Sequence, residues 1–170
     1  MKELGIENLN DNGFALIGKE WMLVTAGTPG NFNMMTASWG GIGWLWNKPV
    51  AFVFIRHERH TFGFVEGSNT MTLSFLGNDP AMRQLYSLLG TKSGRDIDKM
   101  HTPGLTPVAA PNGGVMYSES RLTLVCKKLF SADMTEQNFL DKSLTERWYG
   151  EHGGYHRVYV VEIESAFCQD

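Results

Sequence analysis

The sequence predicts a mainly β protein, an antiparallel barrel with short helices inserted between its strands. Three observations support this prediction. Strand-like apolar runs recur along the 170 residues, helix signals are short and few, and no strand–helix–strand alternation of a parallel sheet is found. With 42% hydrophobic and 19% charged residues, the chain has the composition of a globular protein. It is long enough for a substantial core, and we expect a single domain over residues 1–170.

The predicted strands are apolar runs bounded by turn-forming residues. The run 21–26 is apolar and precedes the turn 27–30, and a second extended piece covers 33–39. The run 49–55 consists almost wholly of apolar β-branched and aromatic residues. It is therefore predicted to be a strand buried on both faces. Further strands are predicted at 70–76, 121–130 and 156–167.

Helix signals are confined to two places. A short helix is expected over 61–66, with Thr61 as its N-cap and Gly67 at its end. A longer helix begins with Asp79 as N-cap and Pro80 in the first helical position. The apolar face of this second helix, which ends at a glycine, consists of Met82, Leu85, Leu88 and Leu89.

Composition also limits the partners. A net charge of −3 gives no basic face for nucleic acid, and no run approaches the roughly 18 apolar residues of a membrane span. The N-terminus lacks the apolar segment of a signal peptide. Cys126 and Cys168 lie far apart in the sequence and outside any CxxC pair. Two free thiols are therefore favoured, with a disulfide as the alternative. We therefore expect a cytoplasmic protein with no membrane or nucleic-acid partner.

The end of the run 49–55 carries groups suited to a phosphate. Arg56 and Arg59 supply charge-assisted donors, and Thr61 supplies a hydroxyl at the start of a helix, where backbone N–H groups are free. The alternative is an ordinary solvated basic loop. His57 and His60 do not form an HExxH pattern and have no cysteine or carboxylate cluster beside them. No metal site is expected.

The segment 33–40, with sequence NMMTASWG, offers a different set of groups. Asn33, Thr36 and Ser38 provide polar contacts, and Trp39 provides a flat apolar wall. Together with the basic segment they suit a ligand with one flat polar ring system and one phosphate. Flavin mononucleotide (FMN) fits that description. The alternative is that Trp39, like Trp44 and Trp46, is a core or interface aromatic.

A third polar segment, 92–99, follows the second helix. Gly94 allows close approach, and Ser93, Arg95 and Lys99 offer donors. Read alone, the segment is better explained as a solvated surface loop that contains internal ion pairs.

These three segments together resemble the flavin reductase-like, FMN-binding split-barrel family, and within it the flavoredoxins. Segment 33–40 resembles the family's N-x-M-T-x-S-W motif, 56–61 resembles its phosphate loop, and 93–99 resembles its SGRDxDK signature. The segments occur in the family's order, with predicted strands between them. The resemblance extends from about residue 18 to residue 167.

The resemblance implies a six-stranded antiparallel split barrel and a homodimer with one FMN per subunit at or near the interface. It places Ser74 and Phe75 beside the ribityl chain, Lys99 in a loop that closes on the cofactor, and Phe167 against the flavin, in part from the partner subunit. No catalytic residue is assigned. The expected cofactor-binding residues are Asn33, Met35, Thr36, Ala37, Ser38, Trp39, Arg56, Arg59, Thr61, Ser74, Phe75, Lys92, Ser93, Lys99 and Phe167.

The activity implied by the resemblance is transfer of electrons from NAD(P)H through FMN to a free flavin or another acceptor. Such chemistry belongs to the cofactor and needs no protein nucleophile. The main alternative is a flavoredoxin-like electron carrier that a redox-protein partner reduces. Two further alternatives are a pyridoxamine phosphate oxidase-like enzyme and a barrel that has lost its cofactor.

Overall fold

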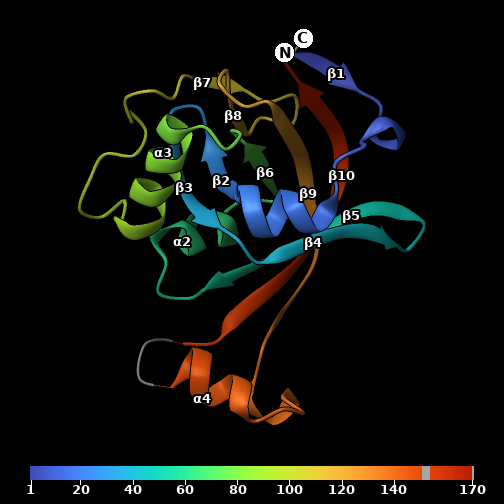
Figure 1. The fold of residues 1–170 in the computed structure, drawn as a ribbon, viewed down its shortest axis with the longest axis vertical. Coiled ribbons are helices and arrows are strands. Elements are labelled where there is room, and N and C mark those ends of the chain that lie inside the picture. The colour runs from blue at the N-terminus through green and yellow to red at the C-terminus, as the bar shows by residue number, and fades with distance from the viewer. Residues whose placement is uncertain (151–153, 170) are drawn as a thin grey trace.

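The structure, a computed structural model, describes residues 1–150 and 154–169. Eight strands form one antiparallel sheet in the order β3-β2-β6-β9-β10-β5-β4, with β1 paired to the end of β10 (Figure 1). A separate two-stranded sheet pairs β7 (Pro107–Ala109) with β8 (Val115–Tyr117). The strands of the large sheet are β1 (Lys2–Leu4), β2 (Met22–Thr28), β3 (Asn31–Ala37), β4 (Gly40–Leu45), β5 (Lys48–Arg56), β6 (Thr70–Phe75), β9 (Leu122–Asp133) and β10 (His156–Cys168).

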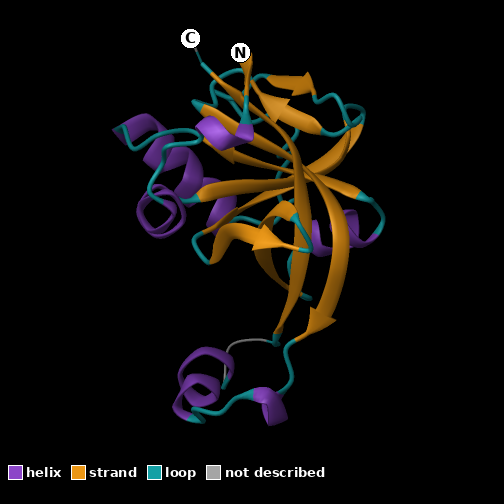
Figure 2. Cartoon of the chain, turned by 90° about the vertical axis from the view of Figure 1, so that its right-hand side faces the viewer, coloured by secondary structure: helices purple, strands orange, loops and turns teal. Residues whose placement is uncertain are grey.

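The helical elements are short and lie outside the sheet. In Figure 2 the strands curl around one another, and the helices cover the flanks. The main core fills the interior between β2, β5, β6, β9 and β10. A second cluster lies where α3 packs on β3 and β8. The helices are η1 (Ile6–Asn8), α1 (Gly13–Ala15), η2 (Leu16–Glu20), α2 (His60–Glu66), α3 (Pro80–Thr91), η3 (Glu136–Asn138) and α4 (Ser143–Tyr149).

The mainly β, antiparallel fold class is as predicted, and each of the six predicted strands is present. Two strands of the sheet, β1 and β4, were not predicted. Strand β4 contains Gly40, Gly41 and Gly43, and glycine is unfavourable in strands because it has no side chain to pack. It forms because its whole length pairs with β5, from Gly40 opposite Val53 to Leu45 opposite Lys48.

The prediction that the 49–55 strand is buried on both faces is wrong. Val53 and Ile55 of β5 are fully buried in the main core, whereas Phe52 and Phe54 on the opposite face are only half-buried. Alternation along the strand separates these two pairs. The second face of β5 is therefore partly open, and its Phe54 lines a cavity that is described below.

The helix predictions are partly corrected. For α3, the Asp79 side chain accepts hydrogen bonds from the N–H groups of Ala81 and Met82, as an N-cap should. Leu88, however, is exposed, and Tyr86 is buried in its place. Its hydroxyl accepts from the N–H of Leu76 and donates to the carbonyl oxygen of Trp21. Helix α2 begins one residue earlier than predicted, and its N-cap is Arg59 instead of Thr61.

The ends of β9 and β10 extend below the body and carry an arm that contains η3 and α4 (Figures 1 and 2). Leu140 in this arm is fully exposed, and Leu144 and Trp148 of α4 are also exposed. Within the described residues, no helix has the length and apolar character required to cross a membrane.

Candidate functional site

Two adjoining cavities bring together the three polar segments singled out in the sequence. The strand cavity, of about 160 Å³, lies where β3, β5 and β10 meet and is lined by residues 35–39, Phe54, Arg56 and His156. The loop cavity, of about 150 Å³, lies between the start of α2 and the segment 90–99. Arg59 lines both cavities. The two cavities therefore adjoin at Arg59, and together they make up one candidate site.

The end of β3 forms the polar and aromatic wall of the strand cavity. Met35, Thr36, Ala37, Ser38 and Trp39 all line it. The Thr36 hydroxyl donates to the carbonyl oxygen of Tyr86 on α3, 2.7 Å away, so it presents only a lone pair to a ligand. Trp39, two residues beyond the end of β3, has an exposed fraction of 39%, whereas Met35 and Ala37 of β3 are buried. An indole held at a cavity wall with one face open is suited to contact a flat ring.

His156 is a residue of the strand cavity that the sequence analysis missed. It is the first residue of β10 and lies directly opposite Arg56 in the antiparallel register. Its ring lies 5.2 Å from the Trp39 ring, and its Nδ1 lies 2.8 Å from the Tyr149 hydroxyl. Burial, assisted by the positive charge of Arg56, lowers the pKa of His156 to about 4, so the imidazole is neutral at pH 7. Only the strand pairing reveals this position.

The arm packs against two residues that line the strand cavity, Arg56 and Trp39. The Arg56 Nη2 donates to the carbonyl oxygen of Trp148 over 2.7 Å, and its guanidinium lies 5.2 Å from the Tyr149 ring centre. The Trp148 ring packs edge-on against Trp39, with 5.0 Å between centroids. Arg56 therefore lies in the strand cavity beside the arm. The structure keeps it with Arg59, which lines the same cavity, but separates it from Thr61, which lines only the loop cavity.

The Arg59 side chain has no hydrogen bond or ion pair to any other residue that the structure describes, although its backbone N–H donates to the carbonyl oxygen of Arg56. Its side chain is half-buried at the junction of the two cavities. Burial lowers the pKa of Arg59, the nearby Arg56 adds to this effect, and Glu58 opposes it. A partly desolvated guanidinium without a bonded partner is a binding position for an anion.

The loop cavity holds a second buried cation. Lys99 is only 3% exposed, and its Nζ donates to the carbonyl oxygens of Met34 at 3.1 Å and Leu89 at 2.8 Å. Burial lowers the pKa of Lys99 to about 8, and Arg59 contributes in the same direction. An ammonium carries three donors. Two are bonded to carbonyl oxygens, so a third remains for a ligand in the cavity.

Asn33 and Thr61 form the floor of the loop cavity. The Asn33 Nδ2 donates to the Thr61 Oγ1 over 2.7 Å, and both side chains are buried. Thr61 is therefore held by β3 and does not cap its own helix. A Cβ at Gly94 would overlap the Asn33 Oδ1 and approach the His60 Cδ2 to 2.8 Å. The segment 93–95 can close on this floor only because residue 94 is glycine.

Lys92 and Ser93 also line the loop cavity, at the exit of α3. The Ser93 Oγ accepts a hydrogen bond from the N–H of Arg95. The Arg95 Nη1 donates to the carbonyl oxygen of Glu58 over 3.2 Å, which ties this segment to the end of β5. The loop cavity thus gathers three cationic side chains, from Arg59, Arg95 and Lys99, in addition to the exposed Lys92.

Three of the predicted site residues lie elsewhere. Ser74 and Phe75 are fully buried in β6, where the Ser74 Oγ lies 3.1 Å from the Thr123 Oγ1 and Phe75 belongs to the main core. Their side chains line neither cavity: as consecutive residues of β6 they point to opposite faces of the sheet, and both faces are covered there. Phe167 lies near the end of β10, paired with Glu3 of β1 and Thr123 of β9. Any contact of Phe167 with a ligand depends on a second subunit and stays a prediction.

The described part of the chain contains no group of three or more His, Cys, Asp or Glu side chains arranged for a metal ion. His57 instead lies 2.7 Å from the Asp133 Oδ1, and its ring stacks on Phe62. His60 packs edge-on against Phe64. Each histidine of the 57–60 segment therefore has an aromatic neighbour.

Comparison with known proteins is consistent with this geometry. The sequence model of the flavin reductase like domain matches residues 14–169. A comparison with curated proteins gives no match. Among solved structures, a flavoredoxin from Methanosarcina acetivorans is similar with a TM-score of 0.68 and 16% identity, over 100% of this chain and 77% of that one.

Two other structures extend the comparison. An FMN-binding protein from Thermus thermophilus, solved with bound p-hydroxybenzaldehyde, has a TM-score of 0.67 and 18% identity, over 100% of this chain and 83% of that one. An NADH:FAD oxidoreductase from Streptomyces globisporus, solved with NAD and FAD fragments, has a TM-score of 0.63 and 13% identity, over 88% of this chain and 74% of that one. At these identities the likeness establishes the fold, and it confirms the predicted split-barrel class.

Proposed function

The chain belongs to the flavin reductase-like domain family, and on that premise we propose that it is an FMN-binding oxidoreductase. In the proposal the flavin ring lies in the strand cavity and the phosphate lies in the loop cavity. NAD(P)H supplies the electrons, and a free flavin or another acceptor receives them. The observation that carries the proposal is the half-buried Arg59 guanidinium, which has no bonded partner in the described chain and stands between the two cavities.

The donor set of the loop cavity fits a phosphate group. The cavity holds Arg59, Arg95 and Lys99, and the only carboxylate among its lining residues is Glu58. The Glu58 side chain lies 3.7 Å from the Arg56 Nη1, so its charge is partly satisfied outside the cavity. A dianionic phosphate would offset the desolvation of Arg59 and Lys99 and would supply their missing hydrogen-bond acceptors.

The strand cavity fits the flat ring. Trp39 and Phe54 provide apolar contact, while the Ser38 hydroxyl and the backbone of residues 35–39 provide polar contact. Neutral His156 and the cationic Arg56 lie at the β10 side. When bound, FMN supplies the redox chemistry by accepting a hydride and passing electrons on. The protein binds the phosphate, orients the ring between Trp39 and β5, and limits access from the side covered by the arm.

An electron carrier of the flavoredoxin type is the second candidate. The arm favours it, because Leu140, Leu144 and Trp148 expose apolar side chains there, and Trp148 packs against Trp39 of the strand cavity, as contact with a protein partner would require. The two functions differ in what reduces the flavin.

The deciding experiment is anaerobic absorbance spectroscopy of the FMN-loaded protein before and after addition of NADH or NADPH. Bleaching of the flavin bands within seconds supports the reductase. Bands that bleach only with a reduced partner protein support the carrier. A protein that takes up no FMN contradicts both proposals and indicates a barrel without a cofactor.

We also propose a homodimer in the cytoplasm. Trp44 and Trp46 at the β4–β5 hairpin are 70% and 57% exposed, and Trp46 packs on the exposed Phe130. An apolar groove of about 520 Å³ lies beside them, between η1 and β4. Exposed aromatic residues around an apolar groove support a subunit contact. Light scattering of the purified protein tests this, since a monomeric mass would contradict the proposal.

A further inference from the structure

The Lys99 amine is held in a fixed position beside the loop cavity. Lys99 lines this cavity although it is only 3% exposed, and its Nζ is bonded to the carbonyl oxygens of Met34 on β3 and Leu89 on α3. A tetrahedral nitrogen has four directions, of which the Cε atom takes one and the two carbonyl oxygens take two. The remaining direction carries the third N–H in the ammonium and the lone pair in the neutral amine.

The neutral form of Lys99 is therefore a nucleophile whose two N–H groups are already bonded. Burial lowers the pKa of Lys99 to about 8, and the positive charge of Arg59 acts in the same direction. About a tenth of the molecules then carry the neutral amine at pH 7, on the order of a hundred times the fraction for an exposed lysine with a pKa of about 10.4. Desolvation beside another cation activates a lysine amine as a nucleophile. The proposed function uses only the charged form.

The groups around Lys99 favour an anionic reagent over a neutral one. The Asp98 carboxylate, next to Lys99 in the chain, is exposed and lies 2.6 Å from the His101 Nδ1. The charged and titratable residues that line the loop cavity besides Lys99 are Glu58, Arg59, His60, Lys92 and Arg95. Cationic side chains therefore outnumber the single carboxylate of this lining, and the cavity attracts a phosphate group.

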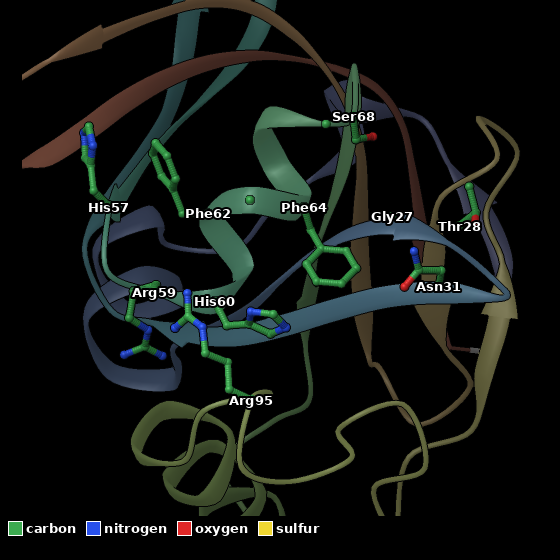
Figure 3. A pocket seen from close by; sticks show the side chains of 12 residues that line it. Gly27, Thr28, Asn31, His57, Arg59, His60, Phe62, Phe64, Ser68 and Arg95 are labelled. Atoms are coloured by element: carbon green, nitrogen blue, oxygen red, sulfur yellow. The ribbon is translucent and has the colours of Figure 1, made fainter.

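A small anion can approach Lys99 from an adjoining cavity. This hairpin cavity, of about 560 Å³, lies between α2 and the β2–β3 hairpin, and Figure 3 shows Arg59, His60 and Arg95 at one end of it. The same three residues line the loop cavity, so the two cavities adjoin there. The loop cavity, of about 150 Å³, corresponds to roughly five water molecules at about 30 Å³ each. A compound with one phosphate and a short side group is of this size.

We propose that Lys99 of the flavin-free protein is a site of acylation by small acyl phosphates. In this reaction the phosphate group binds to Arg59 and Arg95, and the neutral Lys99 nitrogen attacks the adjacent carbonyl carbon. A C–N bond forms while the bond between that carbon and the bridging oxygen breaks. Inorganic phosphate leaves with the proton that the nitrogen loses. The products are an N-acyl lysine and hydrogen phosphate, and no oxidant or reductant is needed.

Acylation changes what the loop cavity can bind. It removes the positive charge of Lys99 and places the acyl group in the cavity. The amide nitrogen keeps a single N–H, so only one of the carbonyl oxygens of Met34 and Leu89 stays bonded. In the proposed function this cavity takes the FMN phosphate, and on that premise FMN and acyl phosphates exclude each other. The acylation itself does not depend on flavin binding.

The test is incubation of the flavin-free protein with acetyl phosphate, followed by peptide mass spectrometry that gives the acetylation rate of each lysine. Lys128 is the matched control, because burial lowers its pKa too and its Nζ donates to the carbonyl oxygen of Val65, yet it lines neither the loop cavity nor the hairpin cavity. We expect Lys99 to react at least about tenfold faster than Lys128. Its rate should saturate with acetyl phosphate, fall when inorganic phosphate is added, and rise about tenfold per pH unit up to pH 8 before it levels off.

A neutral acyl donor, the N-hydroxysuccinimide ester of acetic acid, is the chemical control. It should react with Lys128 at least as fast as with Lys99, since the cations of the loop cavity give it no binding site. Arg59→Ala should slow the reaction of Lys99 with acetyl phosphate at least about tenfold and leave that of Lys128 unchanged. The rate of the neutral donor at Lys99 in this variant measures any accompanying change in the pKa of Lys99, which the charge of Arg59 also lowers.

Equal rates at Lys99 and Lys128, or a rate at Lys99 that does not saturate with acetyl phosphate, overturn the proposal. In the FMN-loaded protein, Lys99 should react at least about tenfold more slowly than in the flavin-free protein. Rapid acetylation of Lys99 with FMN bound would leave the acylation standing and contradict the location of the FMN phosphate in the loop cavity. A protein that binds no flavin would contradict the proposed function and leave the comparison of Lys99 with Lys128 unaffected.

Discussion

Replacing Arg59 by alanine tests where the phosphate lies. Arg59 is half-buried and has no bonded partner in the described chain, so the range for charge-assisted hydrogen bonds, about 1.5–3 kcal/mol, applies to a phosphate contact. An exposed ion pair would contribute at most about 1 kcal/mol. Lys99 and Arg95 remain in Arg59→Ala, so binding is weakened but not lost. We expect the FMN dissociation constant to rise about 10- to 150-fold.

The assay is quenching of flavin fluorescence, with riboflavin as the second ligand. Riboflavin has the same ring and ribityl chain but no phosphate, so its dissociation constant should change less than about twofold in Arg59→Ala. Lys127→Ala serves as the control for net charge, because Lys127 is exposed on β9 and lines neither cavity of the candidate site. Burial opposes the charge of Arg59, so the flavin-free variant should unfold at the same or a higher temperature.

Two results would refute this reasoning. Unchanged FMN binding would show that the phosphate does not lie at the junction of the cavities. An equal loss for FMN and riboflavin would show that Arg59 acts on the ring or on the fold. A lower unfolding temperature of the flavin-free variant would favour the effect on the fold.

Three further changes have defined outcomes. Trp39→Ala should shift the absorbance and raise the fluorescence of bound flavin, and unaltered spectra would indicate that Trp39 does not contact the ring. FMN affinity should be constant between about pH 7, where the phosphate is a dianion, and pH 8. Above pH 8 it should fall by up to about tenfold per pH unit, because Lys99, with a pKa of about 8, then loses its proton. A titration of Lys99→Met that shows the same slope would contradict this. The flavin-free protein should also become more stable between pH 8 and about 10.4, since the unfolded chain then binds more protons than the folded one. Gly94→Ala should displace Asn33 from Thr61, weaken FMN binding at least about tenfold and lower the free energy of unfolding by about 1–3 kcal/mol, as chemical denaturation would measure.

Local sequence signals were sufficient for much of the fold. The apolar runs specified six strands, and Asp79 followed by Pro80 specified the start of α3. Strand β4 was missed because its three glycines interrupt the alternation of polar and apolar side chains that identifies a strand. It forms through its pairing with β5. The exposed Leu88 was misplaced because helical periodicity does not say which residues of a face reach the sheet and which reach solvent.

For the candidate site, the residue types indicated a ligand with a flat ring and a phosphate, but they did not show which side chains meet in space. Segments 33–40, 56–61 and 92–99 do meet, as their shared donor chemistry suggested. His156 was missed because its place beside Trp39 depends on the register between β10 and β5, a pairing of residues about a hundred positions apart. Thr61 was read as a helix cap, yet its hydroxyl accepts from Asn33 of another strand. Such long-range contacts leave no local trace in the sequence.

The charge around the strand cavity has a consequence for the driving force of electron transfer. Two cationic residues, Arg56 and Arg59, line this cavity. His156 is neutral at pH 7, and no Asp or Glu is among the lining residues. A two-electron reduced flavin carries more negative charge than the oxidised form, so this field stabilises the reduced form more strongly. In the proposed complex the midpoint potential should therefore lie above that of free FMN. Electrons would then be accepted readily and retained until an acceptor of still higher potential arrives.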